Sequence, residues 1–170
     1  HSRAAETRPS HQLRRATQRA TDVAATAQQG RDLVRAHKTA GYDFIKVYTR
    51  LSAETYDAIA SESDIRGLRF AGHYSRAKGL ENVLRSKLWS LEHLDGFLAS
   101  TINPASGYNP AAPDSAVLFS ILRDIQSGTK QWSDLFDSAK LQQFATISAN
   151  SNIAHVPTLS YWQNLYTPQS

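Results

Sequence analysis

The sequence contains no cysteine and no long apolar run. Without cysteine, neither a disulfide framework nor a thiolate metal site can form, although this absence does not identify a compartment. Because the apolar runs are only a few residues long, we expect no membrane-spanning segment, and no apolar stretch follows the basic start as a signal peptide requires. Methionine is also absent, even from position 1, so we expect a processed chain or a fragment.

Positive charge is concentrated at the start of the chain. Residues 1–20 hold five arginines and one glutamate, which account for the whole formal net charge of +4. A basic arm can bind nucleic acid or an anionic membrane. This arm has no aromatic residue to stack on bases and no regular basic stripe. We therefore expect a poorly ordered, solvated arm over residues 1–22, with no membrane partner and with nucleic acid disfavoured.

Apolar spacing and boundary residues predict several helices in residues 23–170. The expected helices are 23–37 before Gly41, 52–66 with Ser52 as N-cap and Gly67 as its end, a short one through Leu80, Val83 and Leu84, one from Asp114 to before Gly128, and one around Phe144. Between 95 and 113, repeated Asn-Pro and Ser-Gly pairs predict a long loop.

Four strand-like runs lie among these helices, at residues 44–48, 68–73, 89–93 and 152–157. Alternation of strand and helix with short turns predicts an α/β fold with parallel strands. A closed (β/α)8 barrel needs eight strands and about 250 residues. At 170 residues, we therefore predict a partial TIM-type barrel, about half of one, over residues 23–170.

Three chemically reactive side chains stand at or near the ends of successive strand-like runs: Lys46, His73 and His93. Lysine is almost never buried without a partner for its amine, so Lys46 inside an apolar run needs an explanation. Strand alternation puts Ala71 with His73 on one face and Leu91 with His93 on one face. Since neighbouring strands lie about 4.8 Å apart, inward residues at equal heights can reach a common metal ion.

Three segments, in this order and at this spacing, resemble the metal-dependent amidohydrolase superfamily. They are AGYDFIKVYTRLS, LRFAGHYSRAKGLENVLRSK and SLEHLDGFL, and the likeness is greatest to the imidazolonepropionase-like and dipeptidase-like branch. The resemblance implies that Lys46 is carboxylated and bridges two divalent cations, zinc being the metal we expect, and that His73 and His93 bind the second cation. It also implies hydrolysis of a C–N bond in an amide, cyclic amide or dipeptide by metal-activated water.

The chain departs from this family in two places. The family needs a His-x-His pair on its first strand and an aspartate on its eighth, whereas no His-x-His occurs here and no Asp or Glu follows Asp137. The resemblance thus covers strands four to seven of the barrel, and we assign no catalytic residue. Two interpretations stay open: a fragment of a C–N hydrolase, or a truncated, inactive chain or binding module.

Residues that follow the strand ends are candidates for binding a small molecule or dipeptide, because loops at this end of a barrel line the active site. We predict this role for Tyr48, Tyr74, Arg76 and His155, and Asp95 occupies a similar position. A sheet of only four strands also leaves two unpaired edges, which predicts a homo-oligomer.

Overall fold

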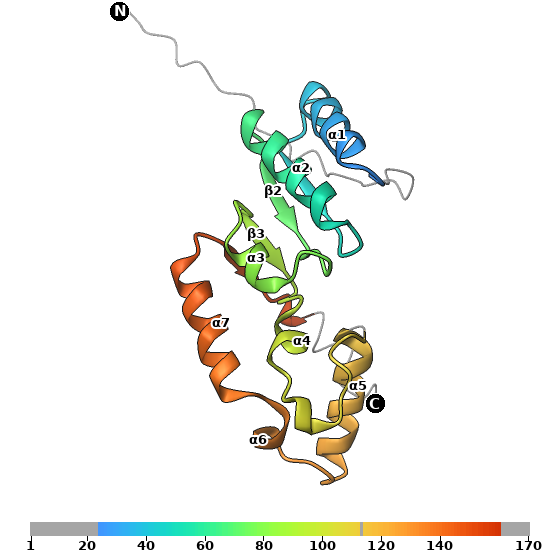
Figure 1. Ribbon diagram of the computed structural model, residues 1–170, viewed down its shortest axis with the longest axis vertical. Helices are drawn as coiled ribbons and strands as arrows, with labels where there is room; N and C mark the ends of the chain where they lie inside the picture. Colours follow the sequence, from blue (N-terminus) through green and yellow to red (C-terminus); the bar gives the residue numbers. More distant parts are fainter. Residues whose placement is uncertain (1–23, 113, 161–170) are drawn as a thin grey trace, which may run out of the picture.

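The computed structural model describes residues 24–112 and 114–160, so the arm predicted over 1–22 lies outside the described residues. Figure 1 shows the elements in chain order. They are α1 (Ala27–Thr39), β1 (Phe44–Val47), α2 (Ala53–Ile65), β2 (Arg69–Gly72), α3 (Leu80–Leu84), β3 (Ser90–Glu92), α4 (Phe97–Thr101), the 3-10 helix η1 (Pro104–Ser106), α5 (Asp114–Gln126), α6 (Trp132–Leu135), α7 (Ser138–Asn150) and β4 (Ala154–Val156).

The four strands form one parallel sheet in the order β1-β2-β3-β4. Two neighbouring rows of aligned residues cross this sheet: Lys46, Ala71, Ser90 and Ala154, and then Val47, Gly72, Leu91 and His155. The predicted mixed α/β architecture with parallel strands is confirmed. Within the described residues the sheet stays open, with β1 and β4 at its edges, so a closed barrel is not formed by them.

The main hydrophobic core lies on the face of the sheet that carries Val47, Phe70 and Leu91, whose exposed fractions are 3%, 3% and 0%. It combines these strand residues with buried side chains from α1, α2, α3 and α7. Lys46 belongs to the opposite face, because its row alternates with that of Val47. The sheet is therefore covered by helices on the Leu91 face, and its reactive lysine lies on the other.

Local sequence signals place the start of α2 and the C-terminal ends of α1 and α2 as expected, whereas α1 begins at Ala27, four residues later than predicted, with Thr26 as its N-cap. The Ser52 hydroxyl accepts a hydrogen bond from the Thr55 amide at 3.1 Å, as an N-cap should. Gly41 and Gly67 follow the helices with φ values of +79° and +60°, the left-handed conformation that ends many helices. Gly30 lets α1 approach α2 closely, since a Cβ there would lie 2.8 Å from Ile59 Cγ1.

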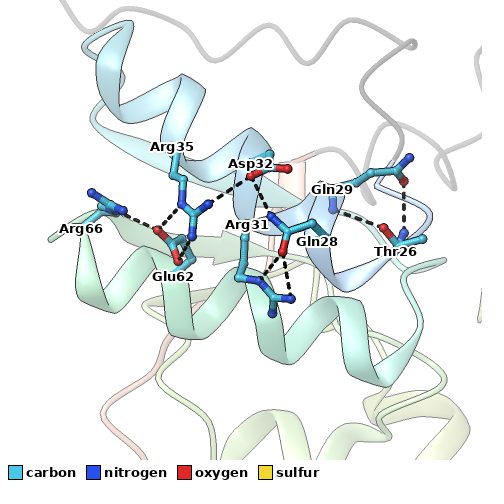
Figure 2. A network of polar contacts seen from close by, with 8 residues as sticks. All are labelled: Thr26, Gln28, Gln29, Arg31, Asp32, Arg35, Glu62 and Arg66. Atoms are coloured by element: carbon cyan, nitrogen blue, oxygen red, sulfur yellow. Dashed lines mark hydrogen bonds and ion pairs between the residues drawn. The ribbon is translucent and has the colours of Figure 1, made fainter.

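A buried carboxylate joins α1 to α2 (Figure 2). Glu62 accepts hydrogen bonds from Arg35 at 2.9 and 3.3 Å and from Arg66 at 2.8 Å. These bonds, with that from Arg35 the strongest influence, lower the pKa of Glu62 from its usual 4.5 to about 2. The carboxylate therefore stays charged at neutral pH and links the two helices.

Residues 95–113 differ from the predicted loop, because they contain α4 and the 3-10 helix η1. The loop-forming pairs follow α4 and do not replace it: Asn103 caps η1, and Ile102 enters a second small core with Val117, Ile121 and Leu135. The segment from α4 to α6 lies beyond the arrowheads of β2 and β3 in Figure 1, near the carboxyl ends of the strands. Among the described helices, none combines the length and apolar character needed to cross a membrane.

Two further expectations concern α5 and the strand ends. Helix α5 begins at Asp114 itself, and the side chain of that residue lies outside the description, so its predicted capping role is not addressed. Strands β2 and β3 end one residue before His73 and His93. Both histidines therefore belong to the loops that leave the sheet.

Candidate functional site

His73 leaves β2 directly after a glycine that the sheet requires. The His73 amide donates to the Val47 carbonyl at 3.0 Å, which extends the contact between β1 and β2. Gly72 has a φ of +123°, and a Cβ there would lie 2.4 Å from Val47 O and 2.8 Å from Val47 N. Glycine is thus the residue that allows β1 to come this close to His73.

His93 reaches the same place through a left-handed turn. Leu91 lies on the helix-covered face of the sheet, whereas Lys46 lies on the other, so a continued strand would carry His93 to the Leu91 face. Instead φ is +61° at His93 and +56° at Leu94. The rings of His73 and His93 then lie with their centroids 5.0 Å apart. The two histidines do come together, but the expectation that strand alternation alone aligns them is wrong.

Each imidazole has its Nδ1 atom engaged by a neighbouring side chain. His73 Nδ1 bonds to the Asp95 carboxylate, with both side chains less than one fifth exposed. His93 Nδ1 lies 2.8 Å from Thr158 Oγ1. Tyr48 stacks its ring on His73 at 4.8 Å and 23°. Both pairings leave the Nε2 atoms as the nitrogens available to a further ligand.

The electrostatics connect Lys46 to this pair. Burial lowers the pKa of His93, and the neighbouring charges of His73 and Lys46 lower it further, whereas Asp95 opposes them. The Lys46 stem also borders Gly72, since its Cγ lies 3.2 Å from the position a Cβ would take there. The half-buried lysine therefore lies in the same neighbourhood as the two imidazoles.

The donor atoms suit a divalent cation in kind but fall short in number. Neutral imidazole nitrogen is a good ligand for zinc, and a carboxylate behind one imidazole is the usual support of such a ligand. Among the described residues, however, no group of three or more His, Asp or Glu side chains surrounds a common point. A catalytic zinc site normally has three protein ligands. The described residues therefore offer two imidazoles, with Lys46 close by, which is fewer ligands than such a site needs.

The aromatic candidates for substrate binding occupy different environments. Tyr48 is 52% exposed, so its stacked ring presents a free face beside His73. Tyr74 is only 7% exposed and packs against Gly96, where a Cβ would lie 2.9 Å from its ring. Tyr48 is thus exposed beside His73, whereas Tyr74 belongs to the core.

Arg76 and His155 contact the segment between β3 and β4. The Arg76 guanidinium donates to the carbonyls of Ala111 and Ala112 at 3.2 and 3.4 Å. His155 lies in the Leu91 row of the sheet and packs edge-on to Phe97 at 5.5 Å. Its two ring nitrogens are buried without a hydrogen-bond partner among the described residues, and this burial lowers its pKa.

Two residues of the site escaped the sequence reasoning, namely Gly72 and Thr158. A glycine directly before a strand-end histidine is a readable signal of close backbone approach. Thr158 carries no such signal, because a β-branched residue with a φ of +50° runs against its own preference. Asp95, a candidate for the pocket, contacts the His73 imidazole.

Neither a protein-family model nor a curated protein matches this chain. Among solved structures, a chain described as "AH, Bottromycin amidohydrolase" is similar at 28% identity with a TM-score of 0.46. The match covers 64% of this chain and 23% of that chain, so this chain spans about a quarter of that protein's length.

Proposed function

We propose that this chain forms the central part of the active site of a metal-dependent hydrolase, which breaks C–N bonds in amides, cyclic amides or dipeptides. The observation that carries the proposal is the close pair of His73 and His93 at the carboxyl ends of neighbouring parallel strands. The quoted sequence segments, with Lys46 next to this pair, support the same reading.

Each residue would have a separate role in that site. Lys46, as a carbamate, and the Nε2 atoms of His73 and His93 would hold divalent cations, with zinc as the first choice. Such cations, when bound, supply an acidified water and polarise a carbonyl group. Asp95 holds His73 in place, and Tyr48 covers one face of that imidazole, where it excludes water.

The remaining ligands and the proton-handling group must come from outside the described residues, because the described part supplies too few ligands. The same shortage supports the alternative of a catalytically inactive chain that keeps the fold. The coding sequence on either side decides between them. A reading frame with His-x-His before the chain and an aspartate after it supports the hydrolase, and its absence supports the inactive form.

Zinc titration of the purified chain by calorimetry tests the site directly. We expect weak zinc binding that is lost in His73→Ala and in His93→Ala. His37→Ala is the matched control, because His37 pairs with the Leu33 carbonyl inside α1 and lies outside the proposed site. Equal binding by wild type and both site variants would refute the proposal.

Hydrolysis by the isolated chain is expected to be negligible, since two imidazoles and a labile carbamate do not make a complete catalytic zinc site. Zinc-loaded chain is assayed on dipeptides and cyclic amides. Robust turnover that disappears in His73→Ala would show that fewer ligands suffice than we assume.

A further inference from the structure

An open pocket lies at the end of the sheet opposite to the two histidines. Its walls are the turn that leads from α3 into β3 and the turn that leads from α7 into β4, so it borders the amino-terminal ends of both strands. Its volume is about 760 Å³, which lies within the range of small-molecule sites. The lining consists of residues 84–89, 146–147 and 150–153, and none of these belongs to the proposed metal site.

The same pair of hydrogen bonds stabilises both turns. The Ser86 hydroxyl donates to the Val83 carbonyl at 2.6 Å and accepts from the Leu88 amide at 3.3 Å. In the second turn the Ser151 hydroxyl donates to the carbonyl three residues before it at 2.9 Å and accepts from the amide two residues after it at 3.4 Å. The walls are therefore formed before a ligand arrives, which lowers the ordering cost of binding.

Trp89 supplies the aromatic part of the lining. Its backbone is held on both sides, because its amide donates to the Phe70 carbonyl at 2.7 Å and its carbonyl accepts from the Ala154 amide at 3.0 Å. The Arg69 guanidinium lies over the indole ring at 4.5 Å, and this cation–π contact restricts the ring. Since 45% of Trp89 is exposed, the indole keeps surface against which an aromatic ligand can stack.

The charged residues of the lining are both basic, namely Arg85 and Lys87. Their acidic partners stand outside the lining: Glu81 lies 2.9 Å from the Arg85 guanidinium, and Asp64 lies 2.6 Å from the Lys87 amine. The basic side chains of these ion pairs are 61% and 74% exposed. Such exposed pairs contribute little to stability, so an anionic ligand can compete for the two cations.

We propose that this pocket binds a small organic anion of the aromatic carboxylate class. The aromatic ring stacks on Trp89, and the carboxylate faces Lys87 and Arg85. Asn150 and Asn152, both exposed in the lining, carry N–H groups that can donate to the same carboxylate. The inference does not rest on the proposed hydrolase function, because the two sites share no residue.

Titration of the 15N-labelled chain with 1-naphthoate, followed by 15N–1H correlation NMR, tests the site. The amides of residues 84–89 and the Trp89 indole N–H are expected to shift, whereas the amides of His73 and His93 at the other end of the sheet should not. For a ligand of this size we expect a dissociation constant of about 1 mM. Two matched probes should bind more weakly: 1-naphthylmethylamine, which reverses the charge, and cyclohexanecarboxylate, which lacks the aromatic ring.

Lys87→Gln should weaken the binding of 1-naphthoate by about two- to fivefold, the usual effect of an exposed ion pair. Lys38→Gln is the matched control, because it removes the same charge from the last turn of α1, outside the pocket, and should leave the affinity unchanged. Both lysines are exposed, so neither substitution should prevent folding.

Three results would overturn the proposal. The first is that no probe shifts the amides of residues 84–89, and the second is that the amine shifts them as strongly as 1-naphthoate does. The third is that these amides shift when the protein concentration alone is raised, because a second copy of the chain then occupies the pocket. Equal affinities of Lys87→Gln and Lys38→Gln would likewise count against the assigned role of Lys87 and the anionic ligand.

Discussion

Replacing Gly72 by alanine tests whether the contact between β1 and β2 fixes the position of His73. The new Cβ would lie 2.4 Å from Val47 O, 2.8 Å from Val47 N and 3.2 Å from Lys46 Cγ. The lysine stem can move aside, but the backbone of Val47 cannot, because its carbonyl accepts the His73 amide at 3.0 Å. The substitution must therefore either separate the strands or distort the turn into His73.

Two costs determine how much Gly72→Ala lowers the free energy of unfolding. A φ of +123° at Gly72 is strained for any residue with a Cβ, at roughly 1–3 kcal/mol. Moving Val47 away from His73 weakens a buried backbone hydrogen bond, which is worth about 1 kcal/mol. We expect Gly72→Ala to lower the free energy of unfolding by about 2–4 kcal/mol, a large part of the stability of an ordinary domain.

Urea denaturation followed by circular dichroism measures this loss. With a slope of about 2 kcal/mol per molar urea, the midpoint should fall by about 1–2 M. Gly67→Ala is the matched control, because its φ of +60° imposes backbone strain while its Cβ would meet nothing within 4 Å. It should cost about 1 kcal/mol. Equal midpoints for the two variants would refute the steric argument.

Leu91→Ala should lower the free energy of unfolding by about 2–5 kcal/mol, because Leu91 is 0% exposed in the main core; an unchanged urea midpoint would contradict this. Glu62→Gln should flatten the acid dependence of stability. The folded pKa of Glu62, about 2, lies below its usual 4.5, so its contribution is complete above about pH 4.5 and is lost as the pH falls towards 2. Urea midpoints measured between pH 7 and 2 should therefore fall less steeply in the variant than in wild type, and parallel curves would count against the linkage.

The parts of the fold that could be predicted are those that short-range signals determine. Ser52 as an N-cap and Gly41 and Gly67 as helix ends act within a few residues of their own position. Helix α4 escaped prediction because five residues are too few to show a period, and strong turn pairs follow it. The parallel direction of the strands could be predicted because strands and helices alternate along the chain.

The closeness of His73 and His93 could be predicted from the sequence, whereas the backbone geometry that brings them together could not. Lys46, His73 and His93 stand out by residue type at the ends of apolar runs. Whether they lie on the same face of the sheet depends on the register between the strands. That register pairs Ala71 with Ser90 and not with Leu91. Register is a property of two segments distant in sequence, so alternation within one strand cannot reveal it. The left-handed conformation of His93 likewise reflects tertiary contacts that override local preference.

The open edges of the sheet lead to a prediction about assembly. Strands β1 and β4 each pair on one side only within the described residues, and Val156 on β4 is 38% exposed. Unpaired strand edges invite pairing with another chain, and a charged side chain at the edge discourages it. We therefore expect the purified chain to self-associate as its concentration rises in sedimentation velocity, and Val156→Lys to shift it towards monomer. Leu141→Lys adds the same charge at a residue of α7 that is 44% exposed and should have little effect. If wild type sediments as a monomer throughout, or if both variants dissociate it equally, the edge strands are not the surface that associates.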